Sequence, residues 1–138
     1  MTSDQTQTAN TAKSTTLTFT LLPNTNYIFN AAFYATNTAT SSLNFQVAAL
    51  PSGATLVAVC SENGVIAVTT GNCVTATATN ILGTSITGAT ATNIAVTVYG
   101  TVTVGSTGGT FELDFLDPAA LGTTTIKAGS WLTVQPVV

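Results

Sequence analysis

Apolar and polar residues alternate along most of this chain with the two-residue period of half-buried β-strands. In the segment Asn93–Val104, isoleucine or valine occupies every second position up to Val98 and again at Val102, with Gly100 between the two runs. Glycine inside a strand can mark a bend. The pattern therefore predicts one long, half-buried strand that is bent at Gly100.

The rest of the chain predicts further short strands. Gly, Pro, Asn or Ser separates nearly all of the apolar segments, and no segment shows helical apolar spacing over ten or more residues. Thr and Val are abundant, and such β-branched side chains suit a pleated sheet. About ten short antiparallel strands predict an all-β jelly-roll β-sandwich. The expected strands are Thr15–Leu21, Tyr27–Tyr34, Leu43–Leu50, Thr55–Cys60, Val65–Thr70, Val74–Thr79, Asn93–Val104, Thr110–Leu116, Thr123–Lys127 and Trp131–Val138.

The length of 138 residues fits one compact domain preceded by a polar arm. Residues 1–14 (MTSDQTQTANTAKS) contain no aromatic residue and no periodicity, which is typical of a flexible arm. We expect a neighbouring chain or a scaffold to hold this arm, and residues 15–138 to form the jelly-roll domain. The expected core residues are Phe19, Phe45, Val96, Val98, Phe111, Leu113 and Phe115.

Charge is scarce, and this limits the partners. Charged residues make up 5% of the chain, the net charge is −3 and the mean hydropathy is +0.45, whereas soluble domains usually carry about a quarter charged residues. A surface so poor in charge favours oligomerisation or docking on a scaffold. With two lysines and no arginine, we expect neither nucleic acid nor a membrane as partner. The first fifteen residues do not resemble an export signal.

Glu112 and Asp114 are the only candidate catalytic pair, since the chain contains no histidine. In the sequence FELDF they share the strand face opposite the three apolar residues, at roughly 6–7 Å from one another. That spacing could suit a retaining glycosidase, but such enzymes line a cleft with aromatic and polar groups. We favour a solvated strand face whose charges discourage stray pairing. The sequence therefore predicts no enzyme and no cofactor.

A metal site is also not expected. Glu112, Asp114 and Asp117 could offer oxygen ligands to Ca²⁺, but the Asp/Asn/Gly loop of a calcium site is missing, and Asp117 before a proline is more typical of a turn. Cys60 and Cys73 are too few for zinc in a chain without histidine.

Cys60 and Cys73 form a candidate disulfide. They flank a segment that contains two Asn/Gly turn signals, so the strands on either side could lie next to one another. A bridge would need Cα atoms less than about 7 Å apart and would stabilise the fold by roughly 3 kcal/mol. The alternative is two buried free thiols that pack as small apolar side chains.

The C-terminal forty residues resemble a family of bacteriophage virion proteins. Three motifs carry the likeness in order, G-T-V-x-V, then G-G-T-(F/V)-x-L-x-F, then T-x-I-K-A-G-S-(W/Y)-L-x-V, and a looser likeness extends back to about Thr15. The family comprises tail-associated and capsid-decoration domains with a tumour-necrosis-factor-like jelly roll. The matching positions are Gly100, Thr101, Val102, Gly108, Gly109, Thr110, Phe111, Leu113, Phe115, Ile126, Ala128, Gly129, Ser130, Trp131 and Leu132.

The resemblance implies a homotrimer of jelly rolls without catalytic activity. Such a protein would be made in the host cytoplasm and mounted on the virion surface, with major capsid or tail proteins as partners. Glu112 and Asp114 stand where uncharged polar residues are expected, which leaves a shared partner surface in doubt. The residues expected at the oligomer interface are Tyr27, Phe29, Tyr34, Tyr99 and Trp131.

The alternative function is a receptor- or glycan-binding module of a tail or head fibre. In that case exposed aromatic rings would form a platform on which sugar rings stack. The candidate platform residues are Tyr27, Tyr34, Tyr99 and Trp131.

Overall fold

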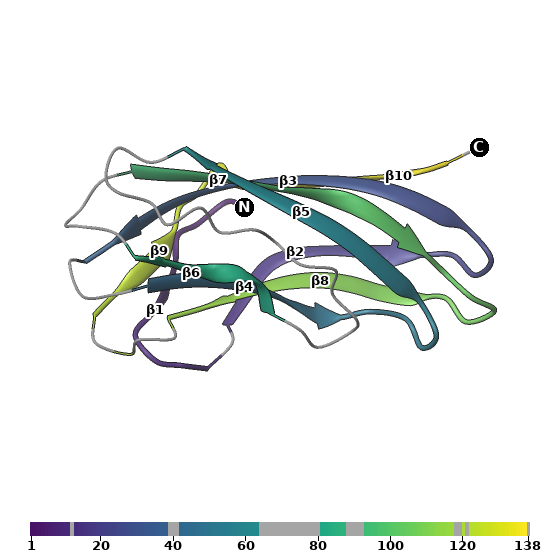
Figure 1. Ribbon diagram of the computed structural model, residues 1–138, viewed down its shortest axis with the longest axis horizontal. Helices are drawn as coiled ribbons and strands as arrows, with labels where there is room; N and C mark the ends of the chain where they lie inside the picture. Colours follow the sequence, from purple (N-terminus) through teal and green to yellow (C-terminus); the bar gives the residue numbers. More distant parts are fainter. Residues whose placement is uncertain are drawn as a thin grey trace.

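The computed structural model shows a β-sandwich of two stacked antiparallel sheets (Figure 1). It describes residues 1–11, 13–38, 42–63, 81–87, 93–117, 120 and 122–137, of which 42, 60–63, 81–87 and 93 are described by their backbone alone. The strands in these ranges are β1 (Gln5–Gln7), β2 (Lys13–Leu21), β3 (Asn26–Asn37), β4 (Ser42–Ala49), β5 (Thr55–Asn63), β6 (Ile81–Thr87), β7 (Asn93–Thr103), β8 (Gly109–Leu116), β9 (Thr124–Ile126) and β10 (Trp131–Pro136).

The strands divide into a six-stranded and a four-stranded sheet. The six-stranded sheet has the order β1-β9-β3-β7-β5, with β10 also paired to β3, and the four-stranded sheet has the order β2-β8-β4-β6. Each strand from β2 to β9 lies in the opposite sheet from the strand before it. No strand pairs with the strand next to it in the sequence, so the described pairings are all non-local, and all of them are antiparallel.

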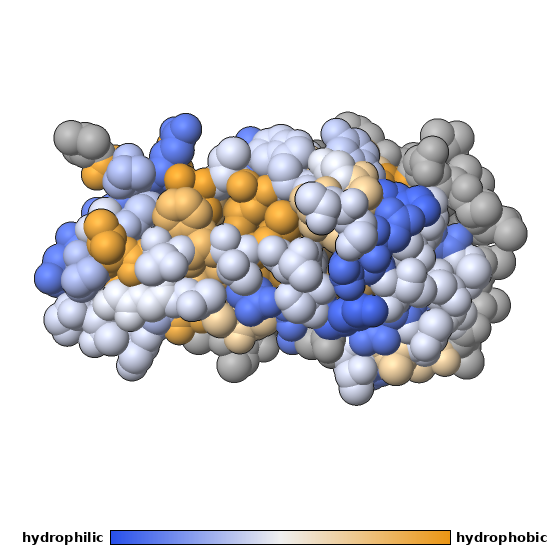
Figure 2. All heavy atoms as spheres, turned by 180° about the vertical axis from the view of Figure 1, so that it is seen from behind, coloured by the Kyte–Doolittle hydropathy of each residue, from blue (hydrophilic) through white to orange (hydrophobic). Residues whose placement is uncertain are grey.

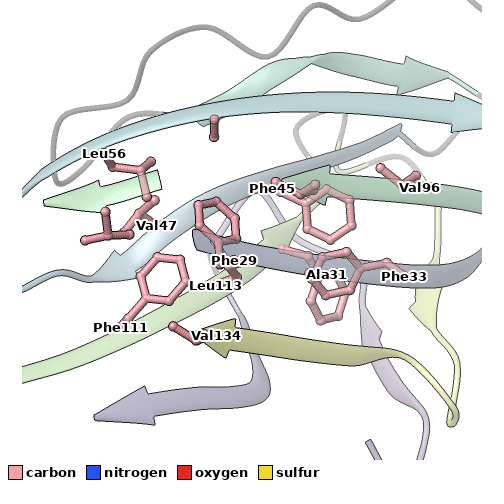
Figure 3. Packing of buried hydrophobic residues seen from close by; sticks show 14 of the residues in the cluster. Phe29, Ala31, Phe33, Phe45, Val47, Leu56, Val96, Phe111, Leu113 and Val134 are labelled. Atoms are coloured by element: carbon pink, nitrogen blue, oxygen red, sulfur yellow. The ribbon is translucent and has the colours of Figure 1, made fainter. Parts of the chain in front are cut away.

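The core lies between the two sheets and is built from the alternate residues that each strand turns inward (Figure 3). Aromatic rings link the layers: Phe33 on β3 stacks on Phe45 on β4 with ring centroids 4.3 Å apart, and Phe29 lies 5.1 Å from Phe111 on β8. Burial of such side chains is the main stabilising contribution in a sandwich of this size.

The sandwich and most of the expected strands are confirmed. All expected core residues are buried except Phe19. The prediction for Phe19 was wrong, because this residue is 39% exposed. Phe19 points inward, but it lies on β2, which in the described part of the chain is an edge strand paired with β8 alone. One flank of its ring is therefore not covered by a described strand of the same sheet. The expected strands Val65–Thr70 and Val74–Thr79 lie outside the described residues. Strands β1 and β6 were not anticipated.

The polar arm folds onto its own chain, and the expectation that a neighbouring chain or a scaffold holds it stays a prediction. Strand β1 pairs with β9, and Lys127 forms an ion pair with Asp4 at 2.7 Å. The carboxylate of Asp4 also accepts the N–H of Ala128, and the Met1 carbonyl accepts the N–H of Gly129. Strand β1 has only polar side chains, and its pairing with β9 rests on backbone hydrogen bonds rather than on burial of apolar side chains.

At Gly100 the structure shows a close approach of two strands, and the bend expected there stays a prediction. On β7, Gly100 pairs with Phe29 of β3 and with Ala58 of β5. A Cβ atom at Gly100 would lie 2.0 Å from the carbonyl oxygen of Val57 and 2.9 Å from the Cα of Ala58. The absence of a side chain thus allows β5 to approach β7 closely at this point.

Candidate interaction surface

The outward side of the six-stranded sheet carries most of the exposed large apolar side chains. Nine such side chains are exposed in the described part of the chain, and six of them project from this one surface. We call these six residues the apolar face: Ile28, Tyr34, Val57, Val59, Tyr99 and Trp131.

The ladder register explains why residues from four strands meet on this surface. Residues directly opposite in an antiparallel pair point to the same side of the sheet. Thr101 on β7 lies between Ile28 on β3 and Val57 on β5, and in the next row Tyr99 lies beside Val59. On the other flank of β3, the edge strand β10 places Trp131 opposite Ala32.

Small side chains separate the three aromatic rings of the apolar face. Trp131, Tyr99 and Tyr34 are 39%, 46% and 47% exposed, and the positions among them are occupied by Ala32 and Thr97. From the strand spacing, the Cα atoms of Trp131 and Tyr34 are about 8 Å apart, and those of Trp131 and Tyr99 about 12 Å. The rings therefore stand up around a low floor.

A shallow hollow of about 270 Å³ lies beside this floor, between β3 and β10. Its lining combines apolar and hydrogen-bonding groups and contains no charge. Such a hollow can accept a side chain or a small neutral ring. The lining residues are Ile28, Phe29, Asn30, Thr133 and Gln135.

Two charged side chains that the structure places near the end of the apolar face neutralise one another. The backbone N–H of Lys127 donates to the carbonyl of Tyr34, which places Lys127 next to the end of the face. Its ammonium group forms the ion pair with Asp4, and the pKa of that carboxyl is lowered by this hydrogen bond and by the N–H of Ala128. On this side of the sheet, the ladder rows run from the row that contains Ile28 to the row that contains Trp131. None of the described side chains in these rows is charged.

On the outward side of the four-stranded sheet, the described side chains of β2, β4 and β8 have the opposite character. Glu112 and Asp114 project from β8 there, among hydroxyl and amide side chains of β2 and β4. Glu112 accepts a hydrogen bond from the hydroxyl of Ser14, and Gln46 lies opposite Asp114. The two carboxylates share one strand face, as the sequence predicted, and each lies in the middle of a sheet rather than in a cleft that the structure describes.

Burial, together with the smaller effect of the neighbouring charge of Glu112, raises the pKa of Asp114 to about 6. Its Oδ1 is buried and has no hydrogen-bond partner, so the ionised form is poorly solvated. Between pH 4 and 6 the folded chain therefore holds a proton that the unfolded chain releases. Folding stability falls as the pH rises through this window.

A third feature is the open side of the sandwich. Strands β2 and β10 are edge strands of the two sheets and contact each other across the layers. Leu17, Phe19 and Leu132 remain partly exposed along these strands. Figure 2 shows apolar side chains gathered on the side of the molecule that faces away from the viewer in Figure 1.

The structure separates the residues that the sequence proposed for the oligomer interface. Tyr34, Tyr99 and Trp131 lie together on the apolar face. Tyr27 and Phe29 do not: each is 3% exposed and packs in the core of its own chain, and the hydroxyl of Tyr27 accepts the N–H of Leu22. These two residues are corrected to core positions, which also removes Tyr27 from the candidate stacking platform.

Sequence reasoning missed the aliphatic half of the face, formed by Ile28, Val57 and Val59. A signal was present, because in β5 Val57 and Val59 alternate with the buried residues Leu56 and Ala58. A strand that is apolar on both faces is typical of one covered on both sides.

The structure does not bring the remaining candidate residues together in a described site. In the described part of the chain no set of three or more acidic or cysteine side chains is placed to hold a metal ion. Asp117 is buried at the end of β8 and its carbonyl accepts the N–H of Ala120, as in a turn. Of the two candidate disulfide residues, Cys60 lies on β5 and is described by its backbone alone, and Cys73 lies outside the described residues. The disulfide therefore stays a prediction.

Comparison with protein-family models, with curated proteins and with solved structures found no match to this chain. Within the described ranges, no helix is long and apolar enough to cross a membrane.

Proposed function

We propose that this chain is a non-enzymatic structural protein that works by surface contact within a larger assembly, most specifically as a capsid-decoration protein of a virion. The observation that carries the proposal is the contrast between the two outward surfaces. The outward surface of the six-stranded sheet carries six exposed large apolar side chains, and none of the described side chains in the same ladder rows is charged. The described outward side chains of the four-stranded sheet include hydroxyls, amides and the acids Glu112 and Asp114. Exposed apolar area of this extent marks a surface that meets protein.

The fold gives further support. We propose that the sandwich is a jelly roll, because consecutive strands from β2 to β9 alternate between the two sheets. The C-terminal motifs that resemble phage virion proteins fall on β7, β8 and the β9–β10 connection. They therefore cover strands of both layers, as expected for a likeness that concerns the whole fold. The homotrimer and the attachment to capsid or tail proteins belong to this proposal.

The virion assignment is tested with an antibody raised against the purified chain. Immunogold labelling of particles isolated from the source culture should mark the capsid at regular positions. Labelling of tails alone would move the protein to the tail, and unlabelled particles would refute the assignment to the virion. Preimmune serum is the control.

A receptor- or glycan-binding module is the second candidate function. It is favoured by the three exposed rings of Trp131, Tyr99 and Tyr34 and by the hollow with its amide lining. A screen of the purified chain against immobilised neutral saccharides tests it. Binding that is lost in Trp131→Ala would support this function, whereas no binding at millimolar concentration would exclude a stacking platform.

A further inference from the structure

We propose that a second copy of this chain covers the apolar face, so that the outward surfaces of two six-stranded sheets pack on one another around a two-fold axis. The inference rests on the proposed role in surface contact, since it names the partner of the same surface, and it replaces the homotrimer of that proposal by a two-fold pair. Three properties of the face support a second copy: its electrostatics, its relief and its area.

Two like-charged chains can meet through this face while the charged side chains that the structure describes stay apart. The chain carries a net charge of −3, but Glu112 and Asp114 lie on the far sheet. Stacked sheets are about 10 Å apart, so the acids of two copies packed face to face would be about 30 Å apart. That exceeds the Debye length of about 8 Å at physiological salt. Near the face itself, Asp4 and Lys127 neutralise one another.

The relief of the face is suited to packing against itself. A two-fold interface needs protrusions and recesses on the same surface, because each copy supplies both. Here Trp131, Tyr99 and Tyr34 protrude, while Ala32 forms part of a low floor and the hollow lies beside it. When two sheets stack at about 10 Å, their side chains interdigitate. The rings of one copy can then fill the floor and the hollow of the other.

The area sets the expected strength. Four strands at about 4.8 Å spacing and seven residues at about 3.3 Å rise give a projected area of roughly 440 Å² per copy. Two copies thus bury at least about 900 Å², and the protruding rings raise this toward the lower limit of about 1,200 Å² for specific interfaces. This lies well below the more than 2,000 Å² of obligate oligomers. We therefore expect a reversible pair with a dissociation constant in the micromolar range.

The experiment is analytical ultracentrifugation of the full chain from 1 to 300 µM. The wild type should pass from monomer to dimer, in 0.1 M and in 1 M NaCl alike, because burial of apolar area is barely screened. Val59→Lys, which places a charge beside Tyr99 on the face, should shift the midpoint at least tenfold upward. Thr20→Lys makes the same chemical change at an exposed position on the other sheet and should leave the midpoint unchanged.

The chain provides an internal probe for the same event. Trp131 is the only tryptophan and lies in the proposed contact, 39% exposed. Its fluorescence emission should shift to shorter wavelength over the concentration range in which the dimer forms, and should not shift in Val59→Lys. Circular dichroism of the two lysine variants should match that of the wild type, since both positions are exposed.

The outcomes separate the inference from the function on which it rests. A monomer at all concentrations, or a dimer that Val59→Lys leaves intact, overturns the face-to-face pair. A trimer overturns the two-fold arrangement while agreeing with the proposed function. Unlabelled particles in the immunogold experiment overturn the proposed function, whatever the oligomeric state of the purified chain.

Discussion

Adding one methyl group at Gly100 should separate two strands of the six-stranded sheet. The Cβ of an alanine at this position would lie 2.0 Å from the carbonyl oxygen of Val57 and 2.9 Å from the Cα of Ala58. Both neighbours are backbone atoms, so no side-chain rotation can relieve the overlap. Strand β5 must move away from β7, its only pairing partner in the described part of the sheet.

The size of the effect follows from the rigidity of the neighbour. Overpacking a core typically costs 1–3 kcal/mol, and a clash with backbone belongs at the upper end, about 3 kcal/mol. Replacing glycine also lowers the entropy of the unfolded chain, which stabilises the folded state by about 0.4–1 kcal/mol. The net loss in the free energy of unfolding for Gly100→Ala is therefore about 2–3 kcal/mol. For a domain of this size that lowers Tm by roughly 10 °C.

Urea denaturation followed by far-ultraviolet circular dichroism measures this loss. The matched control is Gly105→Ala, because the nearest atom to a Cβ there is the carbonyl oxygen of Gly53 at 3.6 Å, an ordinary contact. The control should lie within about 0.5 kcal/mol of the wild type or be slightly more stable. Equal stability of the two variants would refute the close approach of β5 to β7 at Gly100.

Three further changes test other parts of the structure. Asp114→Asn removes a carboxyl group whose pKa in the folded chain is raised to about 6. After allowance for solvent screening, the variant should be more stable than the wild type by about 1 kcal/mol at pH 7.5 and equally stable at pH 4. A gain of equal size at both pH values in urea denaturation would contradict this. Phe33→Ala, at a fully buried ring, should cost about 3–5 kcal/mol, against about 1 kcal/mol for Phe19→Ala, and thermal melts that rank them in reverse would place the core elsewhere. Asp4→Ala removes the ion pair with Lys127, so backbone amides of β1 should exchange with deuterium faster while those of the core strands keep their rates. Unchanged exchange in β1 would show that the backbone hydrogen bonds alone hold the arm.

Strand positions could be predicted from the sequence because alternation is a local property. The segment Asn93–Val104 was expected as one long strand, and β7 spans Asn93–Thr103. Strand β1 was missed because its polar side chains carry no apolar period, and its pairing with β9 depends on residues about 120 positions away.

The apolar face shows what the tertiary structure had to decide. In β3 the sequence places Tyr27, Phe29 and Phe33 on one side and Tyr34 on the other, by parity alone. Both sides are apolar, so parity could not show which one is the core. That choice was made by the second sheet, whose Phe111 and Phe45 pack on Phe29 and Phe33.

Sequence by itself thus determined the strands, the alternation of their faces and the scarcity of charge, because these depend on neighbouring residues only. Tertiary structure decided which side of each strand is buried, since that depends on how two sheets stack. It also decided that Ile28, Val57, Tyr99 and Trp131 meet on one surface, because ladder register brings together positions that are far apart in the chain.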